Sequence, residues 1–168
     1  MAHHSTSIAN SFIQKARSKD SFLTQMQLQK LVYITHGWSL AISNSPITSD
    51  APCAWEYGPV YPELWEALRR YGRSSVSGVI KFGDFGMNMF AKNADEVVTA
   101  DFSETETSLI AKIFEIYGSF HAFQLSALTH KEGTPWYKVF VENKKKKGEI
   151  HNIDIRNHFV EIALNAEA

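Results

Sequence analysis

The segment 24–42, TQMQLQKLVYITHGWSLAI, most constrains what this chain can fold into. Its Thr24 and Gln27 have the spacing of a capping box, in which each side chain binds a backbone N–H at a helix start. The positions that follow are apolar around most of the helix circumference. The remaining polar stripe consists of Gln29, Tyr33 and His36. Because such a helix is usually covered on several sides, we predict that it is the buried centre of the fold.

Gly37 lies in the middle of this predicted helix. A glycine in a helix interior costs about 1 kcal/mol relative to alanine. Its presence therefore indicates that a neighbouring segment crosses the helix closely at this point.

Caps, apolar periodicity and terminators predict further helices on both sides of the central one. Their expected caps or first residues are Ser5 or Ser7, Pro62, Ser103, Phe120, Thr134 and Asp154. The side chains expected to pack inwards include Ile8, Phe12, Leu64, Trp65, Leu68, Ile110, Phe123, Leu125, Leu128, Trp136, Ile155 and Phe159.

The β content is expected to be small. An extended stretch is predicted from Cys53 to Gly58, and two short strands at 79–82 and 97–98 within the weakly patterned region 74–100. The sum is a mainly α, single-domain helical bundle around a buried central helix, with a small β element. We place the domain at residues 5–165 and set residues 1–4 aside as a possible tag remnant.

Composition gives broad limits on function. With 168 residues and a net charge of −1, the chain has the size of one domain and no general attraction to nucleic acid or membranes. Its single cysteine, Cys53, allows no internal disulfide and favours a reducing, cytoplasmic location. No apolar run reaches the length of a membrane span.

Candidate catalytic and metal-binding residues are few. The seven histidines have no metal-ligand spacing, and no phosphate-binding loop or nucleophile elbow is present. Cys53 with a histidine such as His36 or His130 is the one route to a hydrolase. Without a local signature, each is more often a packed core residue. We therefore predict no enzyme activity, no metal site and no cofactor.

An ordered set of motifs covers the chain from about Leu23 to Phe159. It comprises Leu28-Gln-Lys-Leu31, Tyr33, Gly37-Trp38, then Trp55-x-Tyr57-Gly58-Pro59-Val60, then Leu128-Thr129-His130-Lys-Glu132, and Pro135-Trp136. This set resembles the Panacea antitoxin domain, also described as SocA-like or phage-associated GepA-like. The resemblance implies an antitoxin that neutralises a cognate toxin, encoded by an adjacent gene, through direct protein binding. One branch of the family delivers its toxin to a protease, so a protease is a possible second partner.

Two groups of residues follow from these motifs and the helix beside them. The candidate partner-binding residues are Trp55, Tyr57, Gly58, Pro59, Val60, Tyr61, Arg69, Arg70 and Arg73, since aromatic and arginine side chains are enriched at interface hot spots. The aromatic stretch has an alternative interpretation as a turn packed into the core. The motif residues expected to be structural are Leu28, Leu31, Tyr33, Gly37, Trp38, Thr129, His130 and Trp136.

Two other functions stay open at this point. One is a DNA-binding repressor of its own operon, using the three arginines and the run Lys144–Lys147, although the net charge and the lack of a clear helix-turn-helix count against it. The other is the hydrolase based on Cys53.

Overall fold

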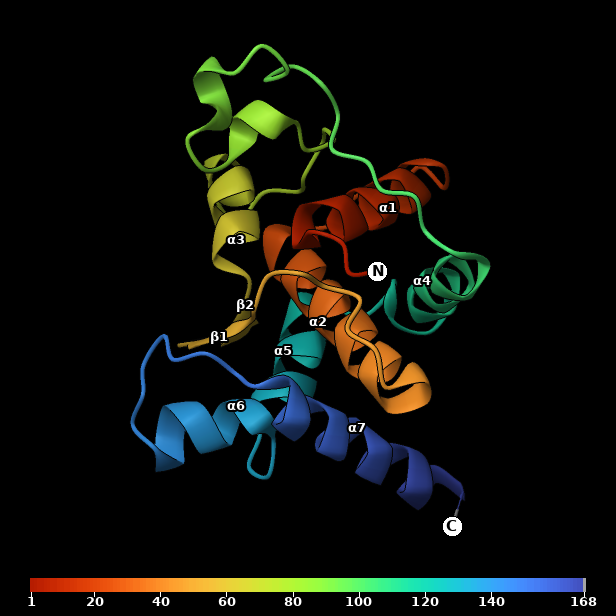
Figure 1. Cartoon of the computed structure of the whole chain (residues 1–168), viewed down its shortest axis with the longest axis vertical. Helices are drawn as coiled ribbons and strands as arrows, with labels where there is room; N and C mark the ends of the chain where they lie inside the picture. Colours follow the sequence, from red (N-terminus) through yellow and green to blue (C-terminus); the bar gives the residue numbers. More distant parts are fainter. Residues whose placement is uncertain (168) are drawn as a thin grey trace.

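The computed structural model describes residues 1–167 and is a bundle of helices around α2 (Figure 1). The helices are α1 (Ser5–Arg17), α2 (Gln25–Ser43), α3 (Pro62–Leu68), α4 (Glu104–Tyr117), α5 (Ala122–His130), α6 (Pro135–Tyr137) and α7 (Asn152–Glu167). Shorter turns are η1 (Arg69–Tyr71), η2 (Phe82–Asp84), η3 (Asn88–Phe90) and the π-helix η4 (Lys138–Glu142). Strands β1 (Cys53–Trp55) and β2 (Gly58–Val60) form an antiparallel pair. The predicted mainly α fold is confirmed.

The central helix α2 forms as its sequence predicts. Thr24 accepts from the backbone N–H of Gln27, the Gln27 side chain accepts from the Thr24 N–H, and Asn44 ends the helix in the left-handed conformation. Helices α1, α3, α4, α5 and α7 all pack on α2. The polar stripe is buried along with the apolar faces, so the helix is enclosed even where its side chains are polar. The last apolar position, Ile42, is exposed.

The close crossing expected at Gly37 is present. The ring of Phe159, on α7, occupies the place that a side chain at Gly37 would need. Phe159 also meets the rings of Tyr33 and Trp38 edge to face, at centroid distances of 6.2 and 5.4 Å. The missing side chain of one glycine therefore lets the last helix dock against the centre of the fold.

Helix α1 begins one residue earlier than the predicted caps allow. Its N-cap is His4, whose ring accepts from the N–H of Thr6, and neither Ser5 nor Ser7 is the cap. Ser5 is held instead by Asp50, which accepts from both its N–H and its hydroxyl group. The inward-facing residues Ile8 and Phe12 are buried as expected.

Residues 1–4, set aside from the sequence as a possible tag remnant, lie against the fold. The backbone of His3 donates to Ile47 O and accepts from Ser49 N, each at 2.8 Å. Its ring contacts Glu106 at 2.9 Å and meets Phe102 edge to face. This segment therefore joins the 43–52 loop to the start of α4.

Deleting residues 1–4 is expected to lower the free energy of unfolding by about 2 kcal/mol, because two backbone hydrogen bonds and a buried ring contact are lost. The measurement is the urea midpoint of unfolding. The variant His3→Gln keeps the two backbone hydrogen bonds that the deletion removes. Comparing the two variants therefore isolates the contribution of those bonds. A deletion with the wild-type midpoint would show that the segment does not stabilise the fold.

The region 72–103 connects α3 to α4 over the outside of the bundle (Figure 1). The two strands predicted here are wrong, since 79–82 and 97–98 are joined by a single isolated bridge, between Lys81 and Val97. The side chain of Asn10 on α1 binds the backbone at Ile80 and Val98, at 2.7 to 2.9 Å. The buried side-chain amide of Asn10 thus binds backbone groups of Ile80 and Val98 that would otherwise be available for further pairing between the two segments.

The remaining helices follow the predicted order with local differences. Ser103 and Glu106 form the second capping box, and Thr134 with Pro135 starts α6. On α5, Leu125 is fully buried but Phe123 is 81% exposed, and Leu128 is also exposed, so two of its three expected anchors are wrong. Helix α7 begins at Asn152, which places Asp154 in the first turn rather than at the cap.

Candidate functional site

The β1–β2 hairpin is where the separate sequence motifs meet. Its turn is formed by Glu56 and Tyr57, and Gly58 follows with a φ of +113°. A side chain at Gly58 would be strained, and it would lie 2.9 Å from Lys30 Cε and 3.3 Å from Thr129 Oγ1. Glycine is therefore needed both for the backbone and for close packing on α2 and α5.

Lys30 fastens the hairpin to α2. Its side chain is fully buried, and its ammonium group donates to Pro59 O at 2.8 Å. No carboxylate pairs with it within residues 1–167. Because burial disfavours the charged form, the pKa of Lys30 is lowered to about 7. Lys30 is not among the residues predicted from the sequence to form a site, although it is the one charged side chain between Thr24 and Ser43.

Side chains from α5 and α6 hold the other face of the hairpin. The hydroxyl group of Ser126 donates to Tyr57 O at 2.7 Å. The indole N–H of Trp136 donates to Trp55 O at 2.6 Å. The ring of His130 meets Trp136 edge to face at 5.3 Å. Residues from α2, α5 and α6 thus converge on three hairpin carbonyl groups, since Lys30 binds the third.

Four of the nine candidate partner-binding residues are buried and contribute little to the surface: Gly58, Pro59, Val60 and Tyr61. Tyr61 is 0% exposed, and its backbone N–H donates to Gln29 Oε1 at 2.8 Å. Its hydroxyl group lies 3.4 Å from Thr48 Oγ1, and burial raises its pKa well above the ordinary value. For this half of the stretch, the alternative interpretation as a packed turn is the one that fits.

The other candidates lie at the surface. Tyr57 is 62% exposed, Trp55 is half-buried, and Arg69, Arg70 and Arg73 are exposed. The guanidinium group of Arg70 is engaged within the chain, since it pairs with Asp84 at 2.7 Å.

Two residues outside the candidate set complete an aromatic and cationic cluster. Trp65, expected to be buried, is 37% exposed and packs against Trp55 at a centroid distance of 5.4 Å. Lys147 lies over the Trp55 ring at 4.9 Å, and Arg69 lies over the Trp65 ring at 6.0 Å. We call Trp55, Tyr57, Trp65, Arg69 and Lys147 the tryptophan surface. Its tryptophan, tyrosine and arginine side chains are the types that most often anchor protein interfaces.

Residues 28–137 match the family described as "Antitoxin SocA-like, Panacea domain". The chain belongs to the SocA-like antitoxin family. It is also 26% identical over 130 residues to a protein named Antitoxin SocA from Caulobacter vibrioides (strain NA1000 / CB15N). That alignment covers 77% of this chain and 66% of the relative. No solved structure matches the chain.

The motif residues expected to be structural in this SocA-like domain lie in or against its core. Leu28, Leu31, Tyr33, Thr129 and Trp136 are buried, Trp38 and His130 are half-buried, and Gly37 carries the α7 crossing. The family match stops at residue 137, yet Lys147 and Phe159 lie beyond it. Part of the tryptophan surface and part of the core therefore come from outside the matched segment.

The candidate nucleophile and the candidate histidine His36 of the SocA-like chain have different surroundings. Burial and the nearby Glu149 raise the pKa of the Cys53 thiol. His36 contacts Asn152 at 2.8 Å and Thr48 Oγ1 at 3.0 Å, and burial lowers its pKa. Cys53 makes no hydrogen bond to a histidine anywhere in residues 1–167. Over the same residues, no group of three or more His, Cys, Asp or Glu side chains is placed to hold a metal ion.

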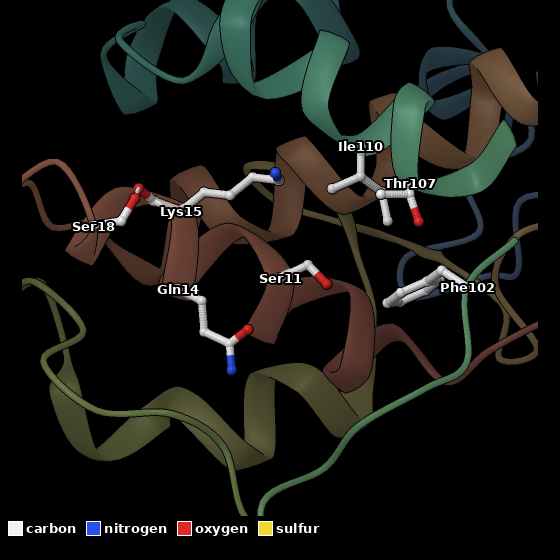
Figure 2. Close-up of a pocket in the computed structure, with 7 residues that line it drawn as sticks. All are labelled: Ser11, Gln14, Lys15, Ser18, Phe102, Thr107 and Ile110. Atoms are coloured by element: carbon white, nitrogen blue, oxygen red, sulfur yellow. Dashed lines mark hydrogen bonds between the residues drawn. The ribbon is translucent and has the colours of Figure 1, made fainter. Parts of the chain in front are cut away.

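The cavities lie away from the hairpin. A cleft of about 300 Å³ separates α1 from the start of α4, with Lys15, Phe102 and Ile110 among its lining residues (Figure 2). A larger groove of about 610 Å³ runs beside residues 98–103 and the N-terminal segment. Within the part of the chain that the structure describes, no helix is both long and apolar enough to cross a membrane.

Proposed function

We propose that this chain is the antitoxin of a bacterial or phage toxin–antitoxin pair and neutralises its cognate toxin by binding it directly. The observation that carries the proposal is the SocA-like family match over residues 28–137. The toxin is expected to be encoded by an adjacent gene. The chain acts by binding rather than by catalysis, which agrees with the lack of a hydrogen bond between Cys53 and any histidine in residues 1–167.

The tryptophan surface is the proposed toxin-binding surface. A stable complex buries about 800 Å² on each partner, with a few aromatic or arginine anchors supplying most of the energy. Tyr57 projects from the turn, and Trp55 and Trp65 lie side by side beneath two cations. The hairpin under Tyr57 is fixed by Lys30, Ser126 and Trp136, so little ordering is needed on binding.

The test is expression of each neighbouring gene alone and together with this chain. One neighbour should arrest growth of a bacterial host, and co-expression should restore growth through a complex that co-purifies. If neither neighbour is toxic, or if no complex forms, the antitoxin proposal is wrong. Measuring the toxin half-life in the same cells separates simple binding from delivery to a protease, which would shorten it.

Tyr57→Ala and Arg69→Ala are each expected to weaken this complex by about thirtyfold, which corresponds to 2 kcal/mol at an interface anchor. Titration calorimetry gives the dissociation constant, after circular dichroism has shown that each variant folds. The matched control is Arg17→Ala, at the exposed arginine that ends α1 and is not part of the tryptophan surface. A complex that forms normally with both variants would place the interface elsewhere while leaving the antitoxin function intact.

A further inference from the structure

The stretch just before α4 has the side-chain pattern of a β-strand but no strand beside it along most of its length. It runs without a turn or bend from Val97 to Phe102. Val98, Ala100 and Phe102 are buried or half-buried, whereas Thr99 and Asp101 are exposed. This alternation with a period of two is the pattern of a strand with one covered face. We call residues 97–102 the unpaired strand.

One edge of the unpaired strand is free. On the other edge, Val98 N donates to Ile80 O, and Glu96 O accepts from Phe82 N, both at 3.0 Å. Successive backbone groups of a strand point to opposite edges, so those of 97, 99 and 101 point away from the Ile80 side. Within residues 1–167, none of these three N–H and three C=O groups has a hydrogen-bond partner.

A groove lies between this strand and the N-terminal segment, on the side of the strand that also holds Phe82. It has a volume of about 610 Å³ and is lined by residues 98–103 together with His3, His4, Ser7 and Phe82, among others. Phe102 borders this groove and also the cleft between α1 and α4, where it points toward α1 (Figure 2).

The charge along the strand is of one sign. No lysine or arginine occurs between Lys92 and Lys112. The acidic side chains Asp95, Glu96, Asp101 and Glu104 form no ion pair within the described chain. Like charges on an exposed edge oppose pairing with a second copy of the same edge. The same charges attract a segment that carries lysine or arginine.

We propose that the unpaired strand is a docking site for an extended, basic peptide segment of a protein partner. The segment adds as a further strand on the free edge, bonding to the backbone of residues 97, 99 and 101. Its lysine or arginine residues face Asp101 and its acidic neighbours. This site shares no residue with the tryptophan surface, so it goes beyond the proposed toxin contact and does not depend on it.

The test uses a phage-displayed library of short random peptides selected on the full chain, with the enriched peptides then synthesised. The enriched sequences should carry lysine or arginine alternating with apolar residues. Hydrogen exchange should show that the amides of 97, 99 and 101 become protected when such a peptide binds. Thr99→Pro removes the central N–H and should weaken binding at least about tenfold, whereas Thr99→Ala, at the same exposed position, should change it less than about twofold.

The charge is tested separately by Asp101→Asn, which keeps the backbone and should reduce both the affinity and its dependence on salt. If Thr99→Pro fails to fold, the exchange data and Asp101→Asn decide the question. The proposal is overturned if no peptide is enriched, if the enriched peptides are acidic, or if bound peptides leave the amides of 97, 99 and 101 unprotected. Concentration-dependent dimerisation lost on Thr99→Pro would also overturn it, because the occupant would then be a second copy.

Discussion

Gly37→Ala is expected to destabilise the protein, although alanine is normally the better helix residue by about 1 kcal/mol. The added methyl group would overlap the ring of Phe159, which is held between Tyr33 and Trp38. Overpacking of a tight core typically costs about 1–3 kcal/mol, so the clash should exceed the gain in helix propensity. Gly37→Leu should cost more and displace α7. Urea midpoints, read by circular dichroism, give the change in unfolding free energy.

The cause of that destabilisation can be isolated with a double-mutant cycle. Phe159→Ala alone should destabilise by about 3–5 kcal/mol, as expected for a buried phenylalanine. In the Phe159→Ala background the obstacle is gone, so Gly37→Ala should be neutral or stabilising. Equal effects of Gly37→Ala in both backgrounds would show that Phe159 is not what requires glycine.

Lys30→Met is the second substitution with a large expected effect. The ammonium group of Lys30 is buried without an anionic partner, and its pKa is about 7 in the folded protein against about 10.4 in an unfolded chain. Near pH 6 the wild type carries the full cost of burying this charge. Methionine has a similar length and no charge, so Lys30→Met should be more stable there by about 1–3 kcal/mol, even after losing the hydrogen bond to Pro59 O.

The pH dependence of the unfolding free energy is a sharper test of the lowered pKa of Lys30. Between pH 7 and 10 the unfolded state binds the Lys30 proton more often than the folded state, so wild-type stability should rise with pH, by up to about 1.4 kcal/mol per pH unit. The lowered pKa of His36 acts below this range, and the raised pKa of Cys53 acts in the opposite sense above about pH 8. His36 and Cys53 are both present in Lys30→Met. The difference between the curves of unfolding free energy against pH for wild type and Lys30→Met therefore isolates the contribution of Lys30. Parallel curves would contradict the lowered pKa.

Features of the fold that depend on local sequence could be predicted, and those that depend on distant contacts could not. The capping boxes at Thr24 and Ser103 involve residues three positions apart, so the sequence contains the whole interaction. Gly37 indicated a crossing but not which helix makes it. The pairing at 80–82 is limited by Asn10, a polar residue about 70 positions away, and no local pattern shows that.

The candidate site shows the same division. Aromatic and arginine residues near the hairpin could be listed from sequence, but the side that each presents to solvent could not. Tyr61 and Tyr57 are both tyrosines of one motif stretch, yet the first binds Gln29 in the core and the second projects from the turn. Lys147 reaches Trp55 because the segment 147–150 pairs with β1, a contact across more than 90 residues.

That pairing has a consequence for exchange of parts between relatives. Gly148 O accepts from Ala54 N and Lys147 N donates to Ala54 O, so the tail pairs with β1 of the hairpin. The same tail delivers Phe159 to Gly37. A chimera that grafts only residues 28–137 into another member of the family would combine β1 and Gly37 from this protein with the C-terminal segment of the other protein. The contacts that Lys147, Gly148 and Phe159 make here would then depend on residues of that other protein. The unit that can be inherited or transplanted intact is therefore longer than the segment 28–137 that matches the family.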